Sequence, residues 1–70
     1  MKRRALLRDI AAAATGTGRA WTRLRQGGEH EIWVCGSTKV SIPRHAEVNE
    51  LTALRIMQAL EEELGERWWR

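Results

Sequence analysis

Residues 25–33, with the sequence RQGGEHEIW, place two adjacent glycines between two stretches of strand-like residues and follow them with a histidine. Glycine allows backbone conformations with φ > 0 and close approach of a ligand to the main chain, so Gly27 and Gly28 predict a tight turn. His30 follows that turn, and its imidazole can gain or lose a proton near neutral pH. The segment therefore predicts a β-hairpin with a candidate acid–base residue near its turn.

Three short strands are expected around this segment. The first covers residues 20–25, the second residues 29–35 and the third residues 39–42, with turns between them at residues 26–28 and 36–38. Strands joined by such short turns pair as an antiparallel meander. Val40 and Ile42 are expected to point inward, and Pro43 ends the third strand because it has no amide proton to donate.

A helix is expected on each side of the meander. Residues 3–15 have helical spacing of apolar side chains and an alanine run that favours helix. Asn49 is the expected N-cap of a second helix, with Glu50 in its first turn and Gly65 as its stop. The apolar stripes are Leu6, Leu7, Ile10, Ala11 and Ala14 in the first helix, and Leu51, Leu54, Met57, Leu60 and Leu64 in the second, where Ala53 and Ile56 widen the stripe.

The predicted order is therefore α-β-β-β-α, an α+β class in which two helices cover one face of a three-stranded antiparallel sheet. One domain is expected over residues 1–70, with a core at about 3–64 and a tail at 65–70. Apolar residues make up 43% of the chain and charged residues 30%, as in soluble globular proteins. The net charge of +3 suits a polyanionic partner such as nucleic acid, although it does not require one.

Cys35 is the only cysteine, which excludes an intramolecular disulfide and a Cys₂His₂ zinc site. We interpret it as structural, because no neighbour in the sequence would activate it as a nucleophile. No stretch approaches the roughly 20 apolar residues of a membrane span, and the short apolar run after the N-terminal basic residues is cut off by Arg8 and Asp9. A cytoplasmic protein without cofactor or metal is expected.

Two interpretations of His30 remain open at this stage. It can be a core histidine that fills space at the start of a strand, or a general acid or base acting on RNA. Attack of a ribose 2′-hydroxyl on the adjacent phosphate needs a base, an acid for the leaving 5′ oxygen and cations around the phosphorus, and it demands no metal. Arg25, Lys39 and Arg44 are the nearest candidate phosphate contacts in sequence or by strand pairing.

Alternatives also remain for the other polar groups near the turn and the second helix. His45 is either a solvated loop residue or part of a phosphate site with Arg44 and the amides of the following helix. Glu47 and Glu50 would oppose such a site locally. The basic run at residues 2–4 is either a solvated helix end or an RNA contact.

The tryptophans likewise have two interpretations. Alternation places Trp21 and Trp33 on the sheet face opposite Leu24 and Ile32. With Arg23 and Arg25 the two rings could form an exposed platform on which bases stack, or they could form a protein-binding surface. Trp68 and Trp69 are expected to fold back on the core or to join an interface.

Three segments together resemble the HicA toxins of type II toxin–antitoxin systems. They are LRQGGEHEIW at residues 24–33, VSIPRH at residues 40–45 and NELT at residues 49–52. The resemblance extends from the first helix to about residue 64. The joint pattern of glycine-X-histidine, Pro-Arg-His and a leucine-rich helix carries it, and each piece alone is weaker.

This resemblance implies a fold like the double-stranded-RNA-binding domain and an mRNA endonuclease that blocks translation, with its catalytic histidine at His30. It also implies a HicB-like antitoxin as partner, with operator DNA contacted only through that antitoxin. The family usually has Gly-Ser-His at the turn, whereas this chain has Glu29 at the middle position. The competing hypothesis is a non-catalytic RNA-binding or protein-interaction module of the same fold.

Overall fold

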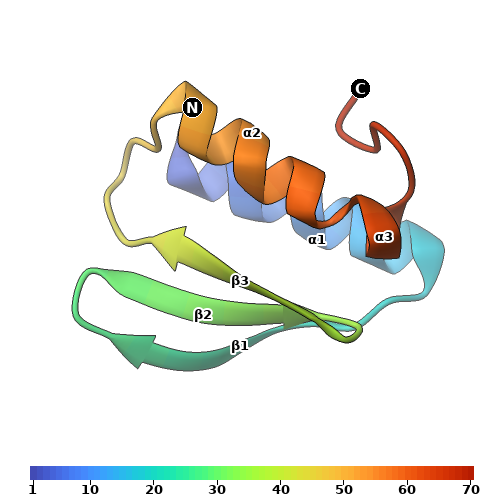
Figure 1. Ribbon diagram of the computed structural model, residues 1–70, viewed down its shortest axis with the longest axis horizontal. Helices are drawn as coiled ribbons and strands as arrows, with labels where there is room; N and C mark the ends of the chain where they lie inside the picture. Colours follow the sequence, from blue (N-terminus) through green and yellow to red (C-terminus); the bar gives the residue numbers. More distant parts are fainter.

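Three antiparallel strands form one sheet in the order β1 (Trp21–Gly27), β2 (His30–Cys35) and β3 (Thr38–Pro43). The computed structural model describes all 70 residues. Helix α1 (Arg3–Thr17) precedes the sheet, and α2 (Glu50–Ala59) and α3 (Glu61–Leu64) follow it. All three helices lie on one side of the sheet (Figure 1), so the predicted α-β-β-β-α architecture is confirmed.

The core lies between the helices and one face of the sheet. On that face, Cys35 of β2 and Val40 and Ile42 of β3 are buried, which confirms the inward prediction for the last two residues. Burial raises the pKa of the Cys35 thiol, in agreement with a structural role. The helices contribute most of the other buried side chains, namely Leu6, Ile10, Ala14, Ala53, Ile56, Leu60 and Leu64.

The opposite face, called here the open face, has no helix over it (Figure 1). Since side chains alternate along a strand and paired residues share a face, register and burial define its members. They are Thr22, Arg25 and Gly27 of β1, His30, Ile32 and Val34 of β2, and Lys39, Ser41 and Pro43 of β3.

The exposed tryptophan platform predicted from the sequence is wrong. Trp21 and Trp33 lie on the helix side of the sheet, pack against the core and stack on each other with ring centroids 4.8 Å apart. Alternation alone shows which residues share a face, but not which face the helices will cover. Leu24, expected on the inner face, is 54% exposed.

A β-bulge at Leu24 also separates residues that the alternation had grouped. Arg23 pairs with Trp33, but Arg25 pairs with Ile32, so β1 has one residue more than β2 at this point. An extra residue in one strand reverses the face of the sheet to which every later side chain of that strand points. Arg23 therefore shares the helix side with Trp33, whereas Arg25 lies on the open face.

The helix ends differ from the prediction in two places. Helix α1 continues through Gly16 to Thr17, and Gly18, which has φ of 72°, takes the C-cap position. The second helix is divided: α2 ends at Ala59 and α3 begins at Glu61, with Leu60 at φ −93° and ψ 1° between them. The buried positions of α2 are Ala53 and Ile56, and Leu51, which was expected in the buried stripe, is 53% exposed.

The start of α2 and the tail follow the prediction. The Asn49 side chain caps α2 by accepting from the amide of Leu51 at 2.9 Å. Trp68 packs against the core and donates from its indole nitrogen to the carbonyl of Met57 at 2.8 Å. The longest helix has 15 residues, and none of the helices combines the length and apolarity needed to cross a bilayer.

Candidate functional site

His30 is the first residue of β2 and is exposed on the open face. Its direct neighbours across the sheet are Gly27 on β1 and Pro43 on β3. Gly27 has no side chain and Pro43 has a short ring, so the imidazole stands free at one end of the sheet and makes no hydrogen bond within the chain. The interpretation of His30 as a core histidine is therefore wrong.

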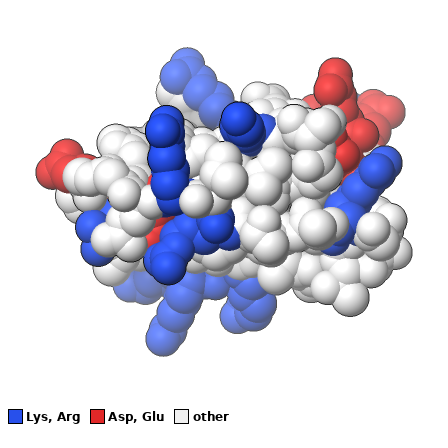
Figure 2. Space-filling view, turned by 90° about the horizontal axis from the view of Figure 1, so that it is seen from below, with Lys and Arg blue, Asp and Glu red and all other residues white.

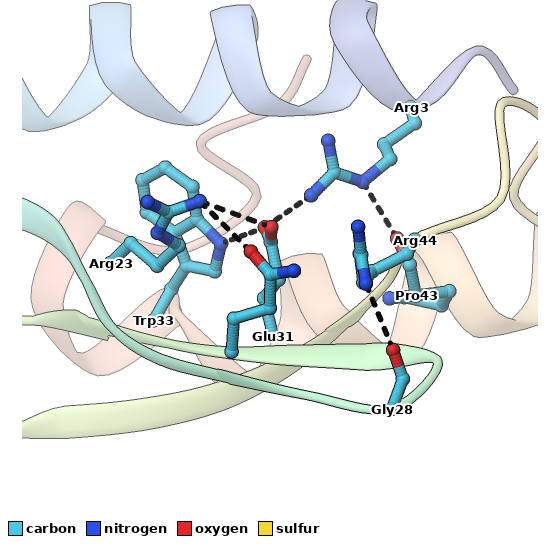
Figure 3. Close-up of polar contacts among 8 residues, drawn as sticks. Arg3, Arg23, Gly28, Glu31, Trp33, Pro43 and Arg44 are labelled. Carbon is cyan, nitrogen blue, oxygen red and sulfur yellow. Dashed lines mark hydrogen bonds and ion pairs between the residues drawn. The ribbon is translucent and has the colours of Figure 1, made fainter.

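The turn before His30 is held in place by Arg44. Gly28 has φ of 57°, a left-handed conformation that favours glycine at this point of the turn. The amide of Arg44 donates to the carbonyl of Glu29 at 2.8 Å, and Arg44 Nη1 donates to the carbonyl of Gly28 at 3.1 Å (Figure 3). Half a rotation of the Gln26 amide places its oxygen 3.0 Å from Arg44 Nη1 as well. The β3–α2 connection thus clamps the turn that carries His30.

The predicted phosphate contacts divide into two groups. Arg25 lies on the open face opposite Ile32, two residues and roughly 7 Å along β2 from His30. Lys39 lies opposite Val34, four residues and roughly 13 Å from His30, so it is outside the immediate site. Gly27, Gly28 and Arg25 therefore lie around the histidine, whereas Lys39 does not. Arg44 contacts the turn beside Gln26, so its guanidinium lies on the helix side of the sheet, opposite to His30.

His45 follows Arg44 in the exposed connection before α2, and its side chain makes no hydrogen bond within the chain. Nothing in the structure places it against His30 as the second member of an acid–base pair.

Seen from below the molecule as drawn in Figure 1, Lys and Arg side chains project from several parts of the surface, whereas Asp and Glu gather mainly at its two ends (Figure 2).

Glu31 lies beside His30 on β2 but points to the helix side, where it is buried. Its carboxylate accepts from Trp33 Nε1 at 3.0 Å and forms ion pairs with Arg3 and Arg23 (Figure 3). The hydrogen bond from Trp33 and the two guanidinium groups outweigh the effect of desolvation and lower the pKa of Glu31.

Arg3 extends this network to the other neighbour of His30. Its Nε donates to the carbonyl of Pro43 at 2.7 Å, while its Nη2 contacts Glu31. The residue after His30 and the residue across from it are thus both tied to the first turn of α1. This network was not predicted from the sequence. Glu31 shares a strand face with Trp33 and Cys35, and a glutamate on a buried face indicates that a cationic partner is required.

No three His, Cys, Asp or Glu side chains lie close enough together to hold a metal ion. Comparisons with protein-family models, with curated proteins and with solved structures gave no match. The resemblance to the HicA toxins thus depends on the segments quoted above.

Proposed function

We propose that this chain is an endoribonuclease of toxin type that cleaves mRNA, blocks translation and uses His30 as its general acid–base residue. The observation that carries the proposal is the placement of His30. It is the free, exposed imidazole on the open face, next to a glycine turn that Arg44 holds in place and on the same face as Arg25. The resemblance to the HicA family gives the same residue this role.

The proposed reaction is a transesterification in which the neighbouring 2′ oxygen displaces the 5′ oxygen from the phosphodiester. His30 accepts the 2′-hydroxyl proton as the 2′ oxygen bonds to phosphorus, and the bond from phosphorus to the 5′ oxygen breaks. The leaving 5′ oxygen takes up a proton from the imidazolium or from water. Arg25, on the same face of the sheet as His30, supplies positive charge where the phosphorane becomes more negative. The chain's own residues thus provide the acid–base group and a cation.

Replacing His30 by alanine tests the assignment, with His45→Ala as the matched control. Because both histidines are exposed, both variants should keep the parent's circular dichroism and thermal midpoint. Purified proteins are incubated with end-labelled RNA in EDTA. We expect His30→Ala to lose about 10²–10⁴-fold in cleavage rate and to relieve growth arrest on induced expression, whereas His45→Ala cleaves like the parent. Equal cleavage by His30→Ala and the parent would refute the assignment.

The second candidate is a non-catalytic RNA-binding or protein-interaction module. The observation in its favour is that the site contains a single histidine, since His45 lies in the connection before α2. It predicts that the parent binds the labelled RNA without releasing fragments and that His30→Ala binds equally well. In that case Arg25→Gln should still weaken RNA binding, because Arg25 lies on the open face and its positive charge attracts RNA whether or not the RNA is cleaved.

A HicB-like antitoxin remains part of the proposal as the partner that would cover this site, with operator DNA contacted only through it. A small neighbouring reading frame of HicB character would support this pairing. Coexpression of its product should restore growth and protect the RNA from cleavage.

A further inference from the structure

A second cationic site lies behind the turn, on the helix side of the molecule. A hollow between the N-terminus of α1 and the β3–α2 connection is lined by Lys2, Arg3, Arg4, Arg44 and Ala46. Four of these five residues are basic, and they come from two segments about 40 positions apart in the sequence. We call this feature the cationic hollow.

Two of its four positive charges are not neutralised by the chain. Lys2 pairs with Glu47 at 2.7 Å, and Arg3 pairs with the buried Glu31. Arg4 has no carboxylate within ion-pair distance, and Arg44 contacts only neutral acceptors of the turn. The hollow therefore keeps a net charge of about +2, and guanidinium groups bind phosphate oxygens through paired N–H donors.

The local backbone adds to this positive field. Helix α1 has no acidic residue in its first turn and no side-chain cap, although negative charge is what stabilises a helix N-terminus. Arg3 and Arg4 occupy that turn instead. A bound anion would offset both the excess side-chain charge and the helix dipole.

Arg44 connects the hollow to His30. It lines the hollow, and it also bonds to both residues that precede His30 in the turn. Arg3 makes a second connection, because it lines the hollow and holds the carbonyl of Pro43, the β3 neighbour of His30. A polyanionic strand that passes His30 at the end of the sheet would reach the hollow by continuing around Arg44.

From this arrangement we propose that the cationic hollow binds a phosphodiester of the same RNA strand that is cleaved at His30. This inference builds on the proposed function and assigns its second phosphate contact. Arg4 is its main ligand, because it is exposed, unpaired and not needed to hold the turn. The hollow raises affinity for RNA and takes no part in the proton transfers.

The test uses the His30→Ala protein, so that the RNA stays intact during the measurement. Arg4→Gln is added to it, with Arg70→Gln as a matched control, because Arg70 is an exposed arginine of the tail outside the hollow. Affinity for a short fluorescent single-stranded RNA is measured by anisotropy at several salt concentrations. Circular dichroism and thermal midpoints show that each variant is folded.

We expect Arg4→Gln to weaken binding about tenfold at low salt and to reduce the slope of log K against log salt by about 0.7, the value for one phosphate contact to a single strand. Arg70→Gln should leave both quantities unchanged. Equal affinities and slopes for the two variants would overturn the proposal. So would binding of inorganic phosphate to the hollow, seen as amide shifts at residues 3–5 and 44, without any change in RNA affinity on Arg4→Gln.

The two proposals fail in different measurements. If the parent binds RNA without cleaving it and Arg4→Gln still lowers affinity, the nuclease assignment fails and the hollow stands as an RNA contact. If His30→Ala abolishes cleavage and Arg4→Gln changes neither affinity nor salt slope, the hollow is rejected and the nuclease stands.

Discussion

At the scale of single residues, Glu29 is the side chain next to His30 that departs from the pattern of the HicA family. It is exposed in the turn, and its carboxylate has no hydrogen bond or ion pair within the chain. Only its backbone carbonyl is engaged, by the amide of Arg44. Under the proposed function, this unpaired negative charge would lie next to the imidazole that an RNA phosphate approaches.

Replacing Glu29 by serine should raise the rate of RNA cleavage about threefold at low salt. Repulsion between a carboxylate and a phosphate about 6 Å apart costs roughly 0.7 kcal/mol in water. The increase in rate should become smaller at high salt, because salt screens this repulsion. Initial rates at low and high salt measure this, with Glu66→Ser in the tail as control. A slower Glu29→Ser enzyme would instead show that the carboxylate orients His30.

At the scale of secondary-structure elements, the end of α1 shows how two similar glycines have different roles. Gly16 lies inside the helix with ordinary backbone angles, and Gly18 caps it in the left-handed region. A methyl group at either position would meet no atom within 4 Å. The two sites therefore differ in backbone conformation and not in available space.

Alanine at these two positions should have opposite effects on stability. Gly16→Ala should raise the free energy of unfolding by about 0.5–1 kcal/mol, because alanine loses less backbone entropy in a helix. Gly18→Ala should lower it by about 1–2 kcal/mol, because an L-residue is strained in the left-handed region. Urea unfolding of both variants checks the signs, and stabilisation by Gly18→Ala would contradict the C-cap at that position.

At the scale of the whole molecule, two glutamates join the helix layer to the sheet. Glu31 connects β2 to Arg3 of α1. Glu63 of α3 accepts from Thr38 Oγ1 at 2.9 Å and from the amide and hydroxyl of Ser37 in the β2–β3 turn. The hydrogen bond from Thr38, followed by those from Ser37 and the charge of Arg19, lowers the pKa of Glu63, while desolvation opposes the shift.

These carboxylates should make stability depend on pH in the acid range. Because the folded pKa of each lies below its ordinary value of 4.5, the stabilisation is fully present above that value and is lost as pH falls through the lowered folded pKa. Glu63→Gln should be less stable than the parent at pH 7 and should lose less stability on acidification. Urea midpoints from pH 7 to pH 3 measure this, with the exposed Glu62→Gln as control. Parallel pH profiles for Glu63→Gln and the parent would contradict the role of this carboxylate.

Much of the site near the turn could be predicted from local sequence. Arg25, Gly27, Gly28 and His30 belong to one hairpin, so chain connectivity alone keeps them together. Lys39 was misplaced because strand pairing brings a residue alongside β2 without setting its distance from His30. The sequence offered the basic run at residues 2–4 and Arg44 as separate RNA contacts. It did not predict that they meet in one hollow, because the contact between residues 2–4 and 44–46 depends on packing between distant segments.

The sequence by itself determined the order of the elements, the Asn49 cap and the turn before His30, because helix periodicity, capping and glycine conformation act over a few neighbouring residues. Only the tertiary structure decided which face of the sheet the helices cover, and with it the packing of Trp33 against the core and the exposure of His30. The bulge at Leu24 reversed the parity of Arg25, and the pairing of Arg3 with Glu31 joined positions 28 residues apart. The physical reason is that alternation is a local property, whereas burial depends on packing between distant segments.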